Sequence, residues 1–174
     1  EIGDTNNLYV RYNPIDNNEI IRKSKEKVDF EVSNEFLNFI TVGRISEEKG
    51  YDRLIEASNK LLDEGYKFNL YLVGDGFENY MKYLTNRVKY KDYIHFLGKK
   101  QNPYPYLLKA DCFINSSMYE AYCLAVQEAI ILHIPIIMTN YFGSEEAFES
   151  GKAGIIVENS EKGIYDGMLE ILTH

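Results

Sequence analysis

Cysteine is scarce in this chain, and long apolar runs are missing. Its 174 residues include two cysteines, Cys112 and Cys123, which are too few for a disulfide framework, so we expect reduced thiols in the cytosol. The longest strongly apolar run, 129–138, contains His133 and Pro135 and is far shorter than the roughly 20 residues of a membrane-spanning helix. The sequence therefore predicts neither a disulfide-stabilised fold nor a transmembrane helix.

A basic face and metal-ligand clusters are missing as well. The formal net charge is −8, and the paired lysines Lys89, Lys91 and Lys99, Lys100 lie beside acids or in loops, where such clusters are usually solvated. A nucleic-acid backbone requires a basic face, so we expect no nucleic-acid partner. No group of His, Cys and Asp has the spacing of metal ligands, so we expect no metal and no other cofactor.

The amino-terminal segment is polar and rich in Asn, and it lacks the charged and apolar regions of a signal peptide. The chain begins with Glu1 instead of Met, and we interpret it as a piece of a longer protein. Asp16 is expected to cap a short helix over 17–25. We expect residues 1–33 to be a linker and 34–174 to be one domain, because 45% hydrophobic and 26% charged residues are typical of a globular protein.

Runs rich in Ile, Val and Phe alternate with helix-like patterns along that domain. In the first helix-like pattern, Leu54, Ile55, Leu61 and Leu62 share one face, and Gly65 ends the helix. The predicted strands are 36–43, 68–74, 94–98, 112–117, 135–140 and 153–159, and the predicted helices are 51–65, 77–88, 104–110, one within 116–128, 144–151 and 161–174. This alternation predicts a doubly wound, Rossmann-like α/β domain with a mostly parallel sheet covered on both faces.

The loops that follow the strands should carry the chemistry, because ligands of such sheets bind beyond the carboxyl ends of the strands. These loops are VGRISEEKG (42–50), VGDGFE (73–78), FLGKKQNPYPY (96–106), SSMYEAYC (116–123) and TNYFGSEE (139–146). In the first loop, Gly43 permits a sharp turn, and Arg44 and Lys49 lie near a helix amino terminus, a combination that attracts phosphate. The alternative is that both cations are exposed and paired with Glu47 and Glu48.

The second loop is similar to a dinucleotide-binding motif but incomplete. After Gly74 and Gly76, Asn79 occupies the place of the third glycine of G-x-G-x-x-G. A dinucleotide-dependent oxidoreductase is therefore disfavoured. The alternative is that both glycines only form a tight turn between a strand and a helix.

Two carboxylates, Glu120 and Glu128, flank the predicted amino terminus of a helix near 121–123. On a helix their backbones would lie about 12 Å apart along the axis. Carboxylates repel phosphate and accept hydrogen bonds from hydroxyls, so the pair suits two sugar rings joined by a diphosphate, which is a nucleotide-sugar. The alternatives are that Glu128 is an exposed helix residue and that Glu120 only favours the helix dipole.

Several ordered motifs resemble one family. VGRISEEKGYDRLIEA, LYLVGDGFE, IHFLG with NPYPYLLKADCFINSS, and YEAYCLAVQEA with PIIMTN are similar to the carboxy-terminal domain of the GT4 retaining glycosyltransferases, which have the two-domain GT-B fold. The resemblance extends from about Tyr9 to the end, and YNPID (12–16) is similar to the segment that joins the two domains.

The resemblance implies roles for individual residues. Arg44 and Lys49 match the basic pair on the donor diphosphate, while Glu120 and Glu128 match the acids that face the donor sugar and the nucleotide ribose. Together with these, the positions expected to contact the donor are Gly43, Leu97 with the loop after it at the base, Ala121, Tyr122, Cys123 and Leu124. Arg44, Lys49 and Glu120 are the expected catalytic group.

This chain departs from the family within the fourth loop. Where the family commonly has Glu-Gly-Phe-Pro, this sequence has Glu120, Ala121, Tyr122 and Cys123. Replacing Gly restricts the backbone, and replacing Pro adds an N–H and a thiol near the donor. We expect Cys123 to be a small loop residue and not a nucleophile.

The implied function is transfer of a hexose or N-acetylhexosamine, with retention, from a nucleotide-diphosphate sugar, UDP-sugars being favoured, to a glycan or lipid-linked acceptor, in surface polysaccharide synthesis. The acceptor and any membrane contact would depend on a missing amino-terminal domain, and this chain by itself should bind nucleotide weakly and turn over nothing. We expect the protein in the cytoplasm or at the inner face of the membrane. The alternatives are a non-catalytic nucleotide-binding module and a related sugar synthase or phosphorylase.

Overall fold

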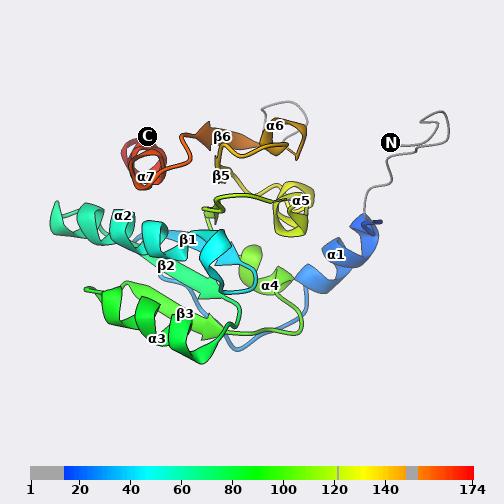
Figure 1. Ribbon diagram of the computed structural model, residues 1–174. Coiled ribbons are helices and arrows are strands. Elements are labelled where there is room, and N and C mark those ends of the chain that lie inside the picture. Colours follow the sequence, from blue (N-terminus) through cyan, green and yellow to red (C-terminus); the bar gives the residue numbers. More distant parts are fainter. Residues whose placement is uncertain (1–13, 121, 148–152) are drawn as a thin grey trace, which may run out of the picture.

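The computed structural model describes residues 14–120, 122–147 and 153–174. Within these ranges six strands form one sheet in the order β3-β2-β1-β4-β5-β6 (Figure 1). Every strand pairing is parallel, so the prediction of a doubly wound α/β domain is confirmed. The strands are β1 (Leu37–Val42), β2 (Phe68–Val73), β3 (Ile94–Gly98), β4 (Cys112–Asn115), β5 (Ile136–Thr139) and β6 (Gly154–Val157).

The helices cover both faces of the sheet (Figure 1). They are α1 (Asn17–Ser24), α2 (Tyr51–Asp63), α3 (Glu78–Arg87), α4 (Tyr104–Leu107), α5 (Leu124–Ile131), α6 (Ser144–Ala147) and α7 (Glu161–Thr173). The chain reverses its direction of travel across the sheet between β1 and β4, which are neighbours. In doubly wound sheets this switch point is where ligands bind.

Alternation along the strands divides the core into two clusters. Within β2, Leu70 and Leu72 belong to the cluster with α2, α3 and α7, and Tyr71 and Val73 belong to the cluster with α1, α4 and α5. This follows from the period of two in a strand, which sends successive side chains to opposite faces. Because both faces are covered, β2 is buried at every position.

The predicted apolar face of α2 is also confirmed. Leu54, Ile55 and Leu61 are each 0% exposed, and α2 packs against α7 and α3. Full burial of such a side chain stabilises the fold by about 1.5–3 kcal/mol. Gly167 allows α7 to approach the sheet, since a Cβ there would lie 2.8 Å from the side chain of Val157.

The amino-terminal helix lies against the domain. Asp16 accepts a hydrogen bond from the backbone N–H of Glu19 at 3.0 Å, as the capping prediction required. Ile20 is 4% exposed, and α1 contacts α4 and α5. The part of the predicted linker that the structure describes is therefore packed on the domain, and the boundary at 33/34 stays a prediction.

The described residues before α5, 116–120 and 122–123, are not helical, which corrects one sequence-based prediction. Cys123, the N-cap of α5, has extended dihedrals (φ −89°, ψ 101°), and the helix begins at Leu124. The distance of about 12 Å along one helix axis therefore does not apply to Glu120 and Glu128. The physical reason is that other segments bind the backbone of 116–118: its carbonyls accept bonds from Arg53, Thr139 and Asn159, and its Met118 N–H donates to Glu48.

Most of the other predicted elements differ by a residue or more at their ends; the helix predicted over 51–65 ends at Asp63 and the strand predicted over 153–159 ends at Val157. The strand predicted over 112–117 ends at Asn115, and the helix predicted over 104–110 ends at Leu107. Of the helix predicted over 144–151, the described part is Ser144–Ala147, and the remainder lies outside the described residues.

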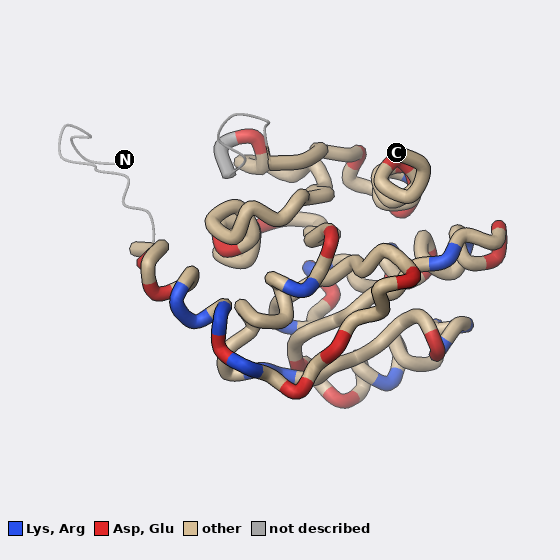
Figure 2. Tube along the Cα trace, turned by 180° about the vertical axis from the view of Figure 1, so that it is seen from behind, with Lys and Arg blue, Asp and Glu red and all other residues tan. Residues whose placement is uncertain are grey.

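Charges are mixed over the backbone trace. In the view from behind, segments of Lys and Arg lie among segments of Asp and Glu, most closely along α1 and the chain after it (Figure 2). On α1, for example, Lys23 pairs with Glu19 at 2.6 Å and Arg22 with Glu26 at 3.7 Å. Among the described helices, none has the length and apolar character that crossing a membrane requires.

Candidate functional site

Two cavities open at the carboxyl ends of the strands, and they share Val42 and Gly43. The Glu120 cavity, of about 310 Å³, is lined by Val42, Gly43, Lys49, Glu120, Tyr122, Cys123, Leu124, Ala125 and Glu128. The Arg44 cavity, of about 560 Å³, is lined by Val42, Gly43, Arg44, Val73, Gly74, Asp75, Gly76, Phe77, Lys99, Lys100 and Pro103. The structure therefore brings Lys49 and both predicted acids to one cavity and leaves Arg44 in the neighbouring one.

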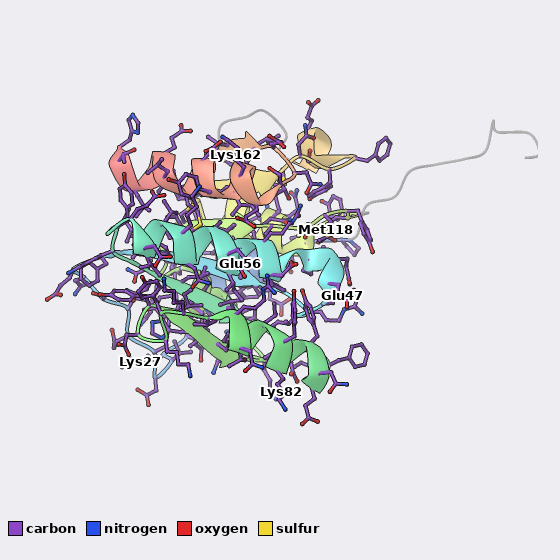
Figure 3. The ribbon with its side chains drawn as sticks, turned by 60° about the vertical axis from the view of Figure 1, so that its left-hand side comes forward. Lys27, Glu47, Glu56, Lys82, Met118 and Lys162 are labelled. Atoms are coloured by element: carbon purple, nitrogen blue, oxygen red, sulfur yellow. The ribbon has the colours of Figure 1, made fainter. Side chains whose placement is uncertain are left out.

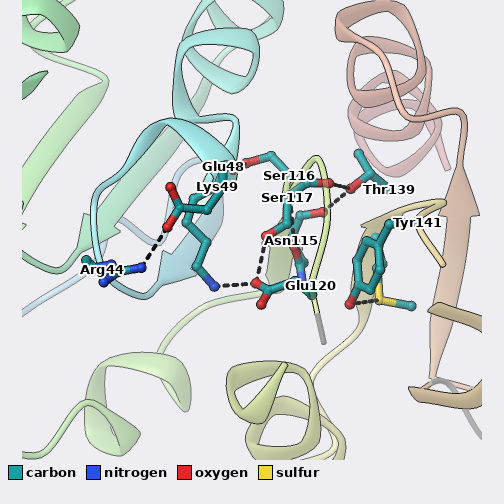
Figure 4. A network of polar contacts seen from close by, with 10 residues as sticks. Arg44, Glu48, Lys49, Asn115, Ser116, Ser117, Glu120, Thr139 and Tyr141 are labelled. Carbon is teal, nitrogen blue, oxygen red and sulfur yellow. Dashed lines mark hydrogen bonds and ion pairs between the residues drawn. The ribbon is translucent and has the colours of Figure 1, made fainter. Parts of the chain in front are cut away.

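The centre of the Glu120 cavity is an ion pair between Lys49 and Glu120 (Figure 4). Their side chains are 20% and 14% exposed, and Ser117 Oγ donates to the same carboxylate oxygen at 2.9 Å. Because this pair is shielded from water, removal of one partner would leave the other charge uncompensated and would destabilise the protein. Of the two predicted cations, Lys49 is thus the one that is built into the cavity.

Hydrogen bonds lock the turn that carries Lys49 onto the loop that carries Glu120. Ser116 Oγ donates to the Lys49 carbonyl at 2.8 Å, and the Met118 N–H donates to the Glu48 carbonyl at 2.8 Å. Gly50 has φ 63°, and a Cβ on it would lie 2.3 Å from the Ser116 carbonyl oxygen. The two loops approach this closely because the residue between the short 3-10 helix Glu47–Lys49 and α2 is a glycine.

Glycines also bring the first two loops together. A Cβ on Gly74 would lie 1.8 Å from the Gly43 carbonyl oxygen, and one on Gly76 would lie 2.0 Å from the Ile45 carbonyl oxygen. Ile45 and Gly76 form an isolated parallel bridge. The glycines of VGDGFE are therefore explained by close backbone contact, in agreement with the tight-turn interpretation.

Glu128 faces the same cavity from α5. Its carboxylate accepts a hydrogen bond from the Tyr104 hydroxyl at 3.1 Å. Burial raises the pKa of Glu128, and burial together with the nearby Glu128 carboxylate raises the pKa of Tyr104 to about 12. The interpretation of Glu128 as an exposed helix residue is wrong, because the side chain lines a cavity and has a partner.

The amino terminus of α5 opens onto the Glu120 cavity, where Leu124 and Ala125 are lining residues. Cys123 is 6% exposed, and burial raises the pKa of its thiol to about 11. At neutral pH such a thiol is protonated and a poor nucleophile, which agrees with its interpretation as a small loop residue. Tyr122 lines the cavity as well, whereas the predicted contact at Ala121 lies outside the described residues.

Arg44 is arranged differently from Lys49. Its side chain is 72% exposed and pairs with Glu48, four residues along the chain, at 2.7 Å (Figure 4). The alternative of an exposed pair is therefore confirmed for Arg44 and wrong for Lys49. An exposed pair of this kind contributes little to stability, and Arg44 is able to change partners at small cost.

The loop predicted to hold the base reaches the Arg44 cavity through its lysines. Lys99 and Lys100 line that cavity, while Leu97 packs against the core cluster that contains α4 and α5. A role for Leu97 itself in binding the donor stays a prediction.

Sequence reasoning missed several residues that support the site. Ser117 donates a hydrogen bond to Glu120, and Tyr104 donates one to Glu128. Tyr51 is 2% exposed and lies close to Gly43: a Cβ on Gly43 would be 3.2 Å from the Tyr51 hydroxyl oxygen. Thr139 Oγ1 donates to the Ser117 carbonyl at 2.6 Å. The available signal was positional: Thr139 ends β5, Ser117 lies in the loop after β4, and Tyr104 begins α4 directly after the loop that follows β3.

Within the described residues, no cluster of three or more His, Cys, Asp or Glu side chains is arranged to hold a metal ion. The chemistry that the Glu120 cavity offers is one ammonium group, two carboxylates and the amides at the start of α5.

The family is decided by a match over most of the chain. The model of the family described as glycosyl transferases group 1 matches residues 22–174. The chain belongs to this family. The resemblance to the GT4 enzymes is thereby confirmed, and the domain is one of the GT-B type.

Curated relatives match a large part of this chain. A Campylobacter jejuni protein named N-acetylgalactosamine-N,N'-diacetylbacillosaminyl-diphospho-undecaprenol 4-alpha-N-acetylgalactosaminyltransferase is 25% identical over 166 residues, which are 94% of this chain and 44% of that protein. The putative colanic acid biosynthesis glycosyltransferase WcaL of Salmonella typhimurium is 30% identical over 134 residues, 72% of this chain and 33% of the relative. The chain spans less than half the length of these relatives.

Solved structures share the fold. HepE of Anabaena, in complex with UDP and glucose, superimposes with a TM-score of 0.71 at 19% identity, covering 79% of this chain and 39% of HepE. WaaG, a glycosyltransferase involved in lipopolysaccharide biosynthesis, has a TM-score of 0.71 at 20% identity, covering 82% of this chain and 39% of WaaG.

Proposed function

We propose that the intact protein is a retaining glycosyltransferase that moves a hexose or an N-acetylhexosamine from a nucleoside-diphosphate sugar to a glycan or lipid-linked acceptor in surface polysaccharide synthesis. The described domain binds the donor in this proposal. The observation that carries it is the Glu120 cavity, where one cation, Lys49, and two carboxylates, Glu120 and Glu128, line a single space beside the amino terminus of α5. The names of the relatives support the glycan product.

The donor diphosphate binds Lys49 and the first amides of α5. A helix amino terminus and an ammonium group both favour a phosphate oxygen. Lys49 exchanges its partner Glu120 for the diphosphate, and Arg44 reaches the same anion across Gly43, which both cavities share. The carboxylate of Glu120 is then available to the hydroxyls of the transferred sugar.

Glu128 binds the ribose of the nucleotide. A carboxylate repels phosphate and accepts hydrogen bonds from neighbouring hydroxyls. The bond from Tyr104 fixes one oxygen of Glu128 and leaves acceptor capacity for a ligand. UDP is the nucleotide that we propose, supported by the solved HepE structure with UDP and glucose and by a TarM structure with UDP.

During transfer, the bond between the anomeric carbon and the leaving diphosphate stretches, and negative charge accumulates on the diphosphate. Lys49 and Arg44 stabilise that charge, which is the contribution of oriented cations in a site of low dielectric constant. The acceptor hydroxyl forms its bond to the anomeric carbon on the same face of the sugar and gives its proton to the departing diphosphate oxygen. Its binding requires groups outside this domain, so this chain by itself binds nucleotide weakly and does not turn over.

Calorimetric titration of this chain with UDP, GDP and ADP, and then with UDP-sugars, tests the proposal. We expect UDP to bind and Glu120→Gln to retain or tighten UDP binding, because the variant releases Lys49. The same variant should lose the preference for UDP-sugars over UDP. The control is Lys82→Ala, an exposed lysine of α3 (Figure 3).

Failure of all three nucleotides to bind at millimolar concentration contradicts the proposal. Binding of UDP with no preference for any UDP-sugar, in the wild type as in Glu120→Gln, favours the non-catalytic nucleotide-binding module instead.

A further inference from the structure

A third hollow lies beside the two cavities and shares Phe77 with the Arg44 cavity. This Tyr80 groove, of about 720 Å³, is lined by Glu47, Glu48, Asp52, Phe77, Asn79, Tyr80, Tyr83, Met118 and Tyr119. Glu47 and Met118 lie close together at one end of the domain (Figure 3), where the Met118 N–H donates to the Glu48 carbonyl. Lys49 and Glu120, the ion pair of the neighbouring cavity, each directly follow a residue of the groove.

Aromatic side chains are exposed along the groove. Phe77 is 82% exposed, Tyr119 67% and Tyr83 43%. The rings of Tyr80 and Tyr83 stack with their centroids 5.7 Å apart and their planes 18° apart. Contiguous exposed apolar surface bordered by polar groups marks a binding surface, whereas single exposed side chains need no explanation.

Two buried polar atoms of the groove lack hydrogen-bond partners in the described part of the chain. They are the Asp52 Oδ1 and the Tyr80 hydroxyl oxygen. The carboxylate oxygen requires a donor, and the tyrosine hydroxyl offers a hydrogen and accepts another. An unpaired buried polar atom costs about 1–3 kcal/mol. Both atoms lie beneath the surface of the groove, so a ligand binds them only when the Asp52 and Tyr80 side chains rotate toward it, and it then satisfies both.

The acidic lining of the groove repels phosphate, and its three acids are stabilised without a cationic ligand. Glu47, Glu48 and Asp52 make the lining acidic. Glu48 is already paired with Arg44, and all three acids lie in the first turn of a helix, where the helix dipole favours them. The ligand that fits is therefore uncharged.

We propose that the Tyr80 groove binds a neutral sugar unit of the acceptor glycan. A sugar hydroxyl both donates and accepts, so it donates to Asp52 and accepts from Tyr80, while the apolar face of the ring stacks on the exposed aromatic side chains. An ammonium or guanidinium group only donates and leaves the hydrogen of Tyr80 unpaired. That the sugar belongs to the acceptor rests on the proposed function, since the groove adjoins Glu120.

Two-dimensional amide NMR of this chain with the neutral oligosaccharides chitotriose and maltotriose tests the proposal. We expect saturable shifts of the amides of 77–83 and 118–119 with at least one of them at millimolar concentration. Tyr83→Ala and Asp52→Asn should weaken that binding at least fivefold and leave UDP binding unchanged. The matched control is Phe142→Ala, which removes an aromatic side chain that is 99% exposed and does not line the groove.

Tyr83 is partly exposed, so its variant keeps the proposal testable if Asp52→Asn fails to fold. Absence of shifts in the groove with both oligosaccharides overturns the proposal, as does tighter binding of penta-arginine at the same amides. Oligosaccharide binding without UDP binding supports the groove and contradicts the proposed function, whereas UDP binding without oligosaccharide binding does the reverse.

Discussion

The Glu120 cavity and the Tyr80 groove lie side by side along the turn 47–49. They differ in whether their polar groups have partners within the protein. In the cavity, Lys49 is paired with Glu120, and Tyr104 donates to Glu128. In the groove, Tyr80 and Asp52 present buried oxygen atoms without partners in the described residues. In the cavity the ion pair keeps both charges compensated before a ligand arrives, because an unpaired buried charge is costly. The cavity thus suits an anionic ligand that takes the place of Glu120 beside Lys49, and the groove suits an uncharged ligand that forms hydrogen bonds.

The largest expected effect concerns the backbone contact between the first two loops. Gly43 lines the Glu120 cavity, and Gly74 lies three residues before Phe77 of the groove. In Gly74→Ala the new Cβ meets the Gly43 carbonyl oxygen at 1.8 Å, so the two loops must separate. We expect a loss of about 2–4 kcal/mol in the free energy of unfolding, measured by urea denaturation.

The matched variant is Gly65→Ala, whose Cβ has no neighbour within 4 Å but whose φ is 94°. It should cost about 1–2 kcal/mol, the strain of a left-handed residue. Equal losses in the two variants would show that the contact between the first two loops has no special weight.

Variants of Lys49 and Arg44 compare a cation that is shielded from solvent with one that is exposed. We expect Lys49→Ala to weaken UDP binding roughly 10-fold to 100-fold, because a charge-assisted hydrogen bond contributes about 1.5–3 kcal/mol. Arg44→Ala should weaken binding only about threefold, since its side chain is 72% exposed and screened by solvent. Calorimetry at low and at physiological salt measures both effects.

Activity assays of a full-length protein refine the same comparison. Lys49→Ala should lower turnover more than it weakens donor affinity, because the charge on the leaving diphosphate is largest in the transition state. Equal losses in turnover and affinity speak against a role in the transition state, and a larger effect of Arg44→Ala reverses the assignment.

Variants of two tyrosines test whether the hydroxyl groups of the cavity and the groove differ in hydrogen bonding. Tyr104→Phe removes the hydroxyl that donates to Glu128 and should lower the free energy of unfolding by about 1 kcal/mol. Tyr80→Phe removes a hydroxyl without such a partner and should be neutral or slightly stabilising. Thermal unfolding of the two variants under one condition decides the point, and a clear destabilisation by Tyr80→Phe would mean that its hydroxyl has a partner.

The smallest effect is a pH dependence at Glu128. Burial raises the pKa of this group in the folded state, so the wild type loses stability as pH rises through that pKa. Glu128→Gln has no such loss. Its melting temperature should exceed that of the wild type by about 1–3 °C at pH 8, and the difference should vanish below about pH 4, where Glu128 is protonated in both states.

A gain for Glu128→Gln that grows toward acid pH would contradict the sign of this pKa shift. The gain in stability should be accompanied by weaker UDP binding, as expected where a functional group is held in an unfavourable environment.

The elements were predictable wherever a pattern repeated with a fixed period. The apolar face of α2 and the fully buried strand β2 follow from local spacing, and the order of strands and helices predicted the parallel sheet. The start of α5 at Leu124 lies next to the predicted 121–123, but the non-helical backbone of 116–118 was not predictable, because it binds Glu48, Arg53 and Thr139, which lie far away in the sequence. Such tertiary bonds override local helix propensity.

By itself the sequence determined the fold class, the loops that carry the site, and the residue types Lys49, Glu120 and Glu128 within them. Only the tertiary structure decided that Lys49, and not Arg44, pairs with Glu120, that Tyr104 supports Glu128, and that the groove beside them has unpaired polar atoms. The reason is physical. Periodicity and turn chemistry are local properties of the chain, whereas burial, ionic pairing and hydrogen-bond satisfaction depend on which distant segments the sheet brings together.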